Sequence, residues 1–431
     1  MKRSMTRSAL ALVAVCAMAG SLRAQTVAIT GGKVYPVSGP PIEGGTVLMR
    51  DGKIVAVGKN IAIPANAERV DATGKWVTPG LVNSNTSVGF GDVGFSGGPR
   101  ELSAKGHDGI AAGFQVWLGF NTQSTMIAPA REGGVTSVVA SPSGGLVAGQ
   151  AAIVDLSGAL PLSEVLVKAP ATMIAQIEDN ESAKVGAAGE AIGQLRDLIE
   201  DTKAYMRRKS DFERAQTRPF VAPRRDLEAM IPVVEGREPL TIIADQAAEI
   251  REVLNIAKDY GIKTVILGGA EAWTLADRIA AAKVPVLTGA MNNIPGSFAT
   301  LGSRQENAAM LRKAGVQVGI IGNAGGGDEE LFNVRNLRYE AGNAVAYGMS
   351  WDDALRAVTL APAEIYGVAD RVGSLKPGTE GNVVIWSGDP LELSTHAEQV
   401  FVRGKKIDTP SRQDLLTKRY QKLPPNYESQ E

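Results

Sequence analysis

Histidine and cysteine are scarce in this chain of 431 residues, which contains two histidines, His107 and His396, and one cysteine, Cys16. A single cysteine excludes an intrachain disulfide and a site built from several thiolates. Two histidines are too few for the three imidazoles that many catalytic zinc sites use. A metal site in this chain would therefore have to rely mainly on oxygen ligands.

An excess of basic charge is also missing. The chain has 45 Lys and Arg residues against 46 Asp and Glu residues, for a net charge of −1. No basic patch indicates binding to nucleic acid. Hydrophobic residues make up 44% and charged residues 21%, which is ordinary for a globular protein and does not indicate disorder.

The first 24 residues have the pattern of a secretory signal peptide. Three basic residues precede the apolar stretch Ala9–Leu22, and the small residue Ala24 marks the expected cleavage site. A lipoprotein signal would need a small residue before Cys16, but Val15 stands there. We therefore expect residues 1–24 to be removed and the protein to be periplasmic or secreted. No later apolar run has the length of a membrane span, so we expect no membrane anchor after cleavage.

The remaining chain divides into regions of three kinds by their sequence patterns. Residues 25–78 and 368–408 read as short strands and turns, with a hairpin signal at Asp51-Gly52 between two apolar segments. Residues 79–367 alternate short apolar runs with helical segments, which is typical of βα units around a parallel sheet. The sequence predicts a composite β-sandwich from both chain ends (25–78 plus 368–408), a barrel (79–367) and a loosely ordered tail (409–431).

Several elements inside the barrel region are predicted individually. Strands are expected at 135–140, 241–244 and 263–267, and an amphipathic helix at 246–260. Ser350, with Asp353 three residues later, has the capping-box pattern of a helix start. The charged, helix-prone residues 185–229 are predicted to be a solvated insertion between barrel units.

Four segments carry a resemblance to a known family. Residues 77–83 (Val-Thr-Pro-Gly-Leu-Val-Asn) resemble the first barrel strand of the amidohydrolase superfamily, and 354–363 resemble its last barrel helix. Residues 371–386 resemble its return into the β-domain, and 130–146 also fit. The chain is most similar to the exported imidazolonepropionase-like and dipeptidase-like branch of these metal-dependent hydrolases. The resemblance implies an α/β fold, a TIM (β/α)8 barrel plus a small composite β-sandwich.

The resemblance also implies a chemistry. Members hold zinc or another divalent metal at the C-terminal mouth of the barrel, using imidazoles and carboxylates. The metal activates a water molecule for attack on a carbon–nitrogen bond, and a carboxylate of the last strand accepts the proton of this water. Such an activity would make the protein a hydrolase of amides or cyclic amides.

The positions that would hold this metal carry other residues here. The His-x-His pair falls on Asn85 and Ser87. The fifth-strand histidine falls near Ile243 and the sixth-strand histidine near Gly268, and these two middle positions are fixed only to within one residue. The eighth-strand aspartate falls on Asn323. Isoleucine and glycine side chains offer no ligand atom, and an amide oxygen binds a cation weakly beside an imidazole. We therefore predict no metal and no cofactor.

The bridging lysine of the fourth strand cannot be placed firmly, although Lys168 is a candidate. Other groups could still do chemistry near the mouth. Asp245, Glu271 and Asp328 follow predicted strands and could form an oxygen-rich cation site or a metal-free carboxylate pair, or could be helix caps and surface charges. His107 could act as a general base or be an ordinary loop residue, whereas His396 lies in the β-domain, away from the expected mouth.

Three functions remain open. The first is a non-catalytic homologue that acts as a binding module or as the partner of a catalytically intact amidohydrolase paralogue, with an oligomer expected. The second is a hydrolase of carbon–nitrogen bonds with an atypical site. The third is a solute-capturing protein whose mouth forms a pocket. Three aromatic residues either line that pocket or pack the loop: Phe114, Trp117 and Phe120.

Overall fold

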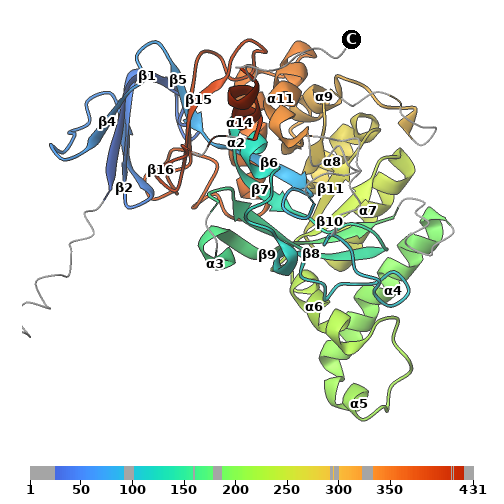
Figure 1. Ribbon diagram of the computed structural model, residues 1–431. Coiled ribbons are helices and arrows are strands. Elements are labelled where there is room, and N and C mark those ends of the chain that lie inside the picture. Colours follow the sequence, from blue (N-terminus) through green and yellow to red (C-terminus); the bar gives the residue numbers. More distant parts are fainter. Residues whose placement is uncertain are drawn as a thin grey trace, which may run out of the picture.

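The computed structural model describes residues 25–91, 101–158, 161–177, 187–291, 295, 300–322, 333–408, 410 and 412–421. The predicted signal peptide lies outside the described residues, as do Asn323 and Asp328. The described chain forms a strand-rich region beside a larger barrel (Figure 1).

The strand-rich region is one sheet that draws on both ends of the chain. Its order is β16-β15-β14-β5-β1-β2-β3, with β4 paired to β1. The strands are β1 (Thr26–Val34), β2 (Ile42–Arg50), β3 (Lys53–Gly58), β4 (Glu68–Asp71), β5 (Trp76–Pro79), β14 (Val383–Trp386), β15 (Ala397–Val402) and β16 (Lys405–Lys406). The two chain ends meet where β5 pairs antiparallel with β14. Because the hydrogen bonds define one continuous sheet, the predicted two-layer sandwich is not confirmed.

Alternation of side chains gives this sheet an apolar face. Val27 and Ile29 of β1 and Val47 and Met49 of β2 are buried in one cluster with Phe401 of β15. Successive side chains of a strand point to opposite faces, so these residues, two positions apart along each strand, share one face. These strands therefore pack around a small core of their own.

The predicted hairpin is present at Asp51-Gly52, between β2 and β3. Both residues have positive φ, 52° and 80°, as a type I′ turn requires. A Cβ atom on Gly52 would lie 2.9 Å from the carbonyl oxygen of Arg403. Glycine is therefore required at this position by the backbone angle and by the close approach of another loop.

The barrel is an eight-stranded, nearly closed sheet whose strands follow one another in sequence order. They are β6 (Leu81–Thr86), β7 (Val135–Ala140), β8 (Val147–Asp155), β9 (Leu166–Gln176), β10 (Leu240–Ala244), β11 (Thr264–Gly268), β12 (Val286–Thr288) and β13 (Val318–Ile320). The first and last strands, β6 and β13, contact each other. The predicted barrel is confirmed at this level.

One strand breaks the regular (β/α)8 pattern. Strand β8 runs antiparallel to both of its neighbours, β7 and β9. A parallel strand needs a crossover of about a dozen residues or more, whereas only residues 141–146 separate β7 from β8. Gly144 and Gly145 have positive φ in this short connection. The chain therefore reverses in a tight turn where a crossover helix was expected.

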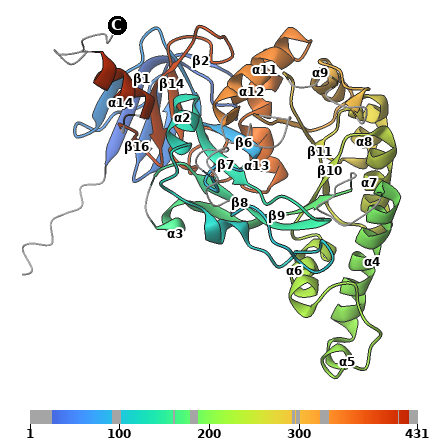
Figure 2. The same cartoon turned by 45° about the vertical axis from the view of Figure 1, so that its right-hand side comes forward.

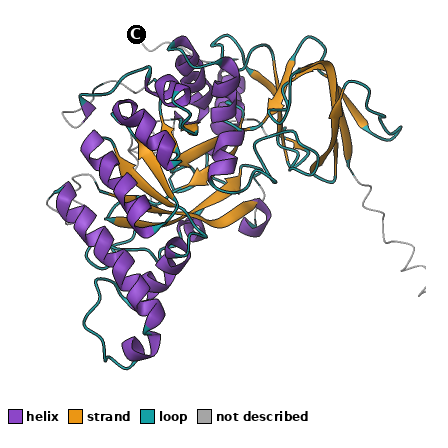
Figure 3. Cartoon of the chain, turned by 180° about the vertical axis from the view of Figure 1, so that it is seen from behind, coloured by secondary structure: helices purple, strands orange, loops and turns teal. Residues whose placement is uncertain are grey.

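Helices cover the outside of the barrel (Figure 3). They are α2 (Ile127–Glu132), α3 (Leu162–Val165), α4 (Ala188–Arg207), α5 (Lys209–Glu213), α6 (Arg224–Val234), α7 (Ala247–Tyr260), α8 (Ala276–Ala282), α9 (Asn307–Lys313), α11 (Leu337–Ala346), α12 (Trp351–Ala357), α13 (Leu360–Ile365) and α14 (Arg412–Tyr420), with short 3-10 turns η1 (Val116–Gly119), η3 (Ala272–Leu275) and η5 (Asn333–Asn336). No helix in the described ranges combines the length and apolarity needed to cross a membrane.

Sequence patterns predicted several of these helices. The Ser350 hydroxyl accepts a hydrogen bond from the Asp353 amide and caps α12, as expected. The predicted insertion contains α4, α5 and the start of α6, and α5 lies at the end that projects away from the barrel (Figure 2). Leu195, Leu198 and Tyr205 on α4 are fully buried, so the insertion is only partly solvated. Helix α14 occupies part of the segment predicted to be a loose tail.

The inside of the barrel is an apolar core. A buried cluster includes Val139, Ile174, Leu267, Leu287 and Ile321, which come from or directly follow five different strands. Each fully buried side chain of this kind contributes about 1.5–3 kcal/mol to stability. A second, larger cluster lies between the strands and the surrounding helices.

Candidate functional site

The mouth of the barrel lies at the C-terminal ends of its parallel strands, where amidohydrolase-like sites would be built. Asn85 stands near the end of β6, and Ser87 directly follows that strand. Ala244 of β10 pairs with Gly268, the last residue of β11, and Ile243 pairs with Gln176, the last residue of β9. The structure thus places the four described candidate positions at one end of the barrel. Asn323, the fifth, is outside the described residues.

Asn83 connects the first and last strands at this end. Its side-chain oxygen accepts hydrogen bonds from the Asn85 amide at 3.3 Å and from the Gly322 amide at 3.4 Å. It is 1% exposed. Asn83 therefore positions the backbone next to Asn323. No sequence pattern indicates this role of Asn83, because its contact with Gly322 joins residues 239 positions apart.

At the two middle positions, Ile243 is held by side-chain packing and Gly268 is required by the backbone geometry. Ile243 packs against the apolar cluster inside the barrel. Gly268 has φ of +98°, and a Cβ atom there would lie 2.6 Å from Asp245 Oδ1. An imidazole at residue 268 would require both a strained backbone and a displaced Asp245.

The carboxylates near these strand ends bind backbone amides. The Ala270 amide donates to Asp245 Oδ1 at 2.9 Å, and the Ala247 amide donates to Glu271 Oε2 at 2.8 Å. These bonds hold the loops that follow β10 and β11. Asp245 and Glu271 therefore cap these loops, each through one of its two carboxylate oxygens.

A third carboxylate, Glu249, lies beside them. Its Oε2 atom accepts from the Asp245 amide at 3.2 Å and the Gln246 amide at 3.1 Å, which completes a capping box at the start of α7. Burial raises the pKa of Glu249, and the charges of Asp245 and Glu271 raise it further. The three-residue spacing of Gln246 and Glu249 is the sequence pattern that could have predicted this capping box.

These donors do not fit the divalent metal site of the family. Within the described ranges there is no group of three or more His, Cys, Asp and Glu side chains arranged to hold a metal ion. The four described candidate positions provide one amide, one hydroxyl, one aliphatic side chain and one glycine. Such a set lacks both the imidazoles and the carboxylate that a zinc site needs.

Neither histidine changes this conclusion. His107 lies in a loop whose residue Ile110 bridges to Val147, at the mouth end of the barrel. Its side chain is 62% exposed, with Nδ1 3.6 Å from Asp108 Oδ2. His396 is exposed and lies 3.2 Å from the Ser387 hydroxyl, just before β15. An exposed imidazole without a positioned partner is a poor general base.

Lys168 lies at the wrong end of the barrel for a bridging ligand. It stands near the start of β9, whereas Gln176 at the end of that strand faces the mouth position Ile243. Its ammonium group donates to the carbonyl of Tyr366 at 2.7 Å. Lys168 therefore helps to close the floor of the barrel.

The three candidate aromatic residues pack the loop that follows β6. Trp117 and Phe120 are 8% and 9% exposed, and Phe90 meets Phe120 edge to face at 5.6 Å. Phe114 is partly buried against the large core cluster. Packing, the second of the two predicted roles, accounts for these side chains.

Comparison with known proteins relates this architecture to one superfamily. The profile described as "Amidohydrolase family" matches residues 263–410. A solved amidohydrolase structure from Thermotoga maritima MSB8 has a TM-score of 0.79 and 28% identity, covering 88% of this chain and 99% of that one. The profile, the curated relatives and the solved structure together support membership of the amidohydrolase superfamily. The resemblance in its sequence motifs is thereby confirmed.

Curated proteins that are similar to this chain include enzymes. An imidazolonepropionase from Acidiphilium cryptum (strain JF-5) is 24% identical over 396 residues, which are 81% of this chain and 89% of the relative. Amidohydrolase tasK from Hapsidospora irregularis is 34% identical over 77 residues, only 18% of this chain and 8% of that protein. The similarity to the first of these extends over most of both chains.

Proposed function

We propose that this chain is an exported, non-catalytic member of the amidohydrolase superfamily that acts as a binding module or as the partner of an active relative. The observation that carries the proposal is the chemistry of the ligand positions. Ile243 and Gly268 offer no donor atom, and Asn85 and Ser87 are weak ligands for zinc. The superfamily fold is retained, and the side chains at these positions are poorly suited to coordination.

The surroundings support this proposal. Asp245, Glu249 and Glu271, which could have supplied oxygen ligands, accept hydrogen bonds from backbone amides. A cation that displaced the amides from these oxygens would leave the amides without a partner, at a cost of about 1–3 kcal/mol each. Packing and capping thus replace coordination among the described residues of the mouth.

Metal content tests the proposal directly. The mature protein, purified without chelators and dialysed against zinc and manganese, should retain less than about a tenth of an equivalent of metal per chain, because it lacks strong ligands. The Acidiphilium imidazolonepropionase, treated identically, serves as the reference. About one tightly held metal per chain would overturn the proposal, since strong ligands would then exist.

Partnership needs a separate test. Co-expression with an intact superfamily member from the same source should yield a complex that survives size-exclusion chromatography. A homo-oligomer that ignores every such relative would remove the partner role and leave a binding module. Thermal-shift screening against dipeptides and cyclic amides would then look for the ligand.

A hydrolase of carbon–nitrogen bonds is the second candidate. It is favoured by the similarity to an imidazolonepropionase over 81% of the chain. If hydrolysis of an amide and cyclic-amide panel is detected, Asp328→Asn and Glu271→Gln should reduce it strongly, because a carboxylate pair could move the proton without a metal. Unchanged turnover in both variants would rule out a catalytic site that uses these two residues.

A further inference from the structure

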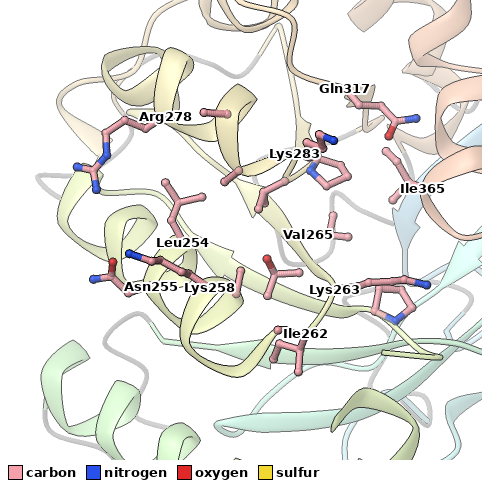
Figure 4. A pocket seen from close by; sticks show the side chains of 18 of the residues that line it. Leu254, Asn255, Lys258, Ile262, Lys263, Val265, Arg278, Lys283, Gln317 and Ile365 are labelled. Atoms are coloured by element: carbon pink, nitrogen blue, oxygen red, sulfur yellow. The ribbon is translucent and has the colours of Figure 1, made fainter. Parts of the chain in front are cut away.

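A cavity of about 820 Å³ lies at the floor of the barrel, opposite the mouth (Figure 4). The C-terminal ends of α7 and α8 form one side. The starts of β11, β12 and β13, together with Ile365 of α13, form the other. The floor of a TIM barrel usually serves stability, so a cavity of this size there calls for an explanation.

Positive charge surrounds this floor cavity. Lys258, Lys263, Arg278 and Lys283 line it, and all four are exposed. Their side chains have no hydrogen-bond or ion-pair partner among the described residues. Four unpaired cations around one cavity are unusual in a chain whose net charge is −1.

The carboxylate in the lining does not neutralise them. Glu364 binds Arg356 at 2.5 Å and accepts a hydrogen bond from Gln317 Nε2 at 3.0 Å. It is therefore already occupied on the far side of the cavity. The positive charge around the cavity is therefore not neutralised by this carboxylate, and an anion that entered would gain from it.

Helix dipoles explain only part of the pattern. Lys258 lies in the last turn of α7 and Lys283 is the C-terminal cap of α8, where cations are favourable. Arg278 lies inside α8, and Lys263 lies between α7 and β11. Neither of these two positions gains from a helix end, so the cluster exceeds what capping requires.

The inner surface of the cavity is mainly apolar, and one buried polar group lies among its lining residues. Thr264 lines the cavity and is 3% exposed, and its hydroxyl has no hydrogen-bond partner among the described residues. Buried hydroxyl groups are normally satisfied. Leu254, Ile262 and Val265 supply apolar lining. The cavity thus has an apolar inner surface and a cationic rim.

We propose that the floor cavity binds an organic polyanion: a small molecule with an apolar body and two or more carboxylate or phosphate groups. Cavities of about 300–1,000 Å³ are the usual size for such ligands. The apolar lining would contact the body, and the four cations would contact the acidic groups. This site is independent of the mouth and of the proposed loss of metal chemistry.

Calorimetric titration with benzene-1,3,5-tricarboxylate tests the proposal. The full mature chain should bind this trianion, and binding should weaken as salt is raised, since exposed charges are screened. The uncharged trimethyl ester should not bind. The double variant Lys263→Gln/Arg278→Gln should weaken binding by about tenfold or more, equivalent to about 1.4 kcal/mol.

A matched control separates the site from general charge. Lys59→Gln/Lys405→Gln removes two exposed cations from the other sheet and should leave the affinity unchanged. Equal weakening in both double variants, absence of binding to the trianion, or equal binding of the ester would each overturn the proposal. A changed sedimentation coefficient in Lys263→Gln/Arg278→Gln would instead show a subunit interface and would also overturn it.

Discussion

Single buried side chains decide how this protein responds to pH and to substitution. Glu238 precedes β10 at the floor of the barrel, is 4% exposed, and has no hydrogen-bond partner among the described residues for either carboxylate oxygen. Burial raises its pKa from 4.5 to about 7, although the nearby charges of Lys168 and Arg237 oppose the shift. The folded state therefore holds a proton that the unfolded state releases.

This difference predicts a pH-dependent stability. Between pH 4.5 and 7 the folded chain binds more protons than the unfolded chain, so stability should fall as pH rises through this window, by at most about 3 kcal/mol. Glu238→Gln should flatten that slope in urea unfolding measured from pH 4.5 to 8. The exposed Glu235→Gln should keep the slope of the wild type. Identical slopes in all three proteins would contradict the prediction.

Gly268 gives a second prediction at this scale. Its φ of +98° and the 2.6 Å separation that an added Cβ atom would have from Asp245 both oppose any side chain. Gly268→Ala should lower the free energy of unfolding by about 1–3 kcal/mol. Gly236→Ala, also at positive φ but with open space around it, is the control for backbone strain alone. A loss no larger than in that control would show that Asp245 can move freely.

At the scale of elements, short-range patterns locate starts and ends well. The capping box of α7 uses Glu249 to satisfy two amides. Glu249→Ala should therefore destabilise the protein by about 1–2 kcal/mol, measured by chemical unfolding. Arg251→Ala, an exposed change on the same helix, should have little effect. If both variants lose the same amount, helix propensity and not capping controls this end.

The direction of the strands was harder to predict at β8, where the chain turns back on itself. The Asp51-Gly52 turn and strand β7 were found where the sequence placed them. Strands β8 and β9 were not predicted individually, since their burial on both faces removes the alternation that marks a strand. The short glycine-containing connection 141–146 could have indicated the hairpin.

At the scale of the whole molecule, one buried network joins the barrel to the other sheet. Asp155, at the end of β8, is fully buried and binds Arg403 Nε at 2.6 Å. The Ser137 hydroxyl and the Asn382 amide donate to the same carboxylate at 2.7 and 3.0 Å. The Asp155 carboxylate therefore links residues of the barrel to residues of the C-terminal part of the chain.

Removing that charge should weaken the contact between the two sheets. Asp155→Ala should lower the free energy of unfolding by about 3 kcal/mol, because Arg403 loses its buried partner. Glu306→Ala, which breaks the exposed pair with Arg304, should cost less than about 1 kcal/mol. Thermal unfolding followed by calorimetry would compare them. Similar losses would show that the network does not hold the sheets together.

The sequence by itself determined the resemblance to the superfamily and the barrel, because these depend on local motifs and on the period of apolar residues. It left the roles of Asp245 and Glu271 open, and it could not place the bridging lysine of the fourth strand, for which Lys168 was a candidate. Only the tertiary structure decided that the two carboxylates bind backbone amides and that Lys168 lies at the floor. Hydrogen-bond partners and the grouping of four cations around one cavity come from segments far apart in the chain, so no local pattern encodes them.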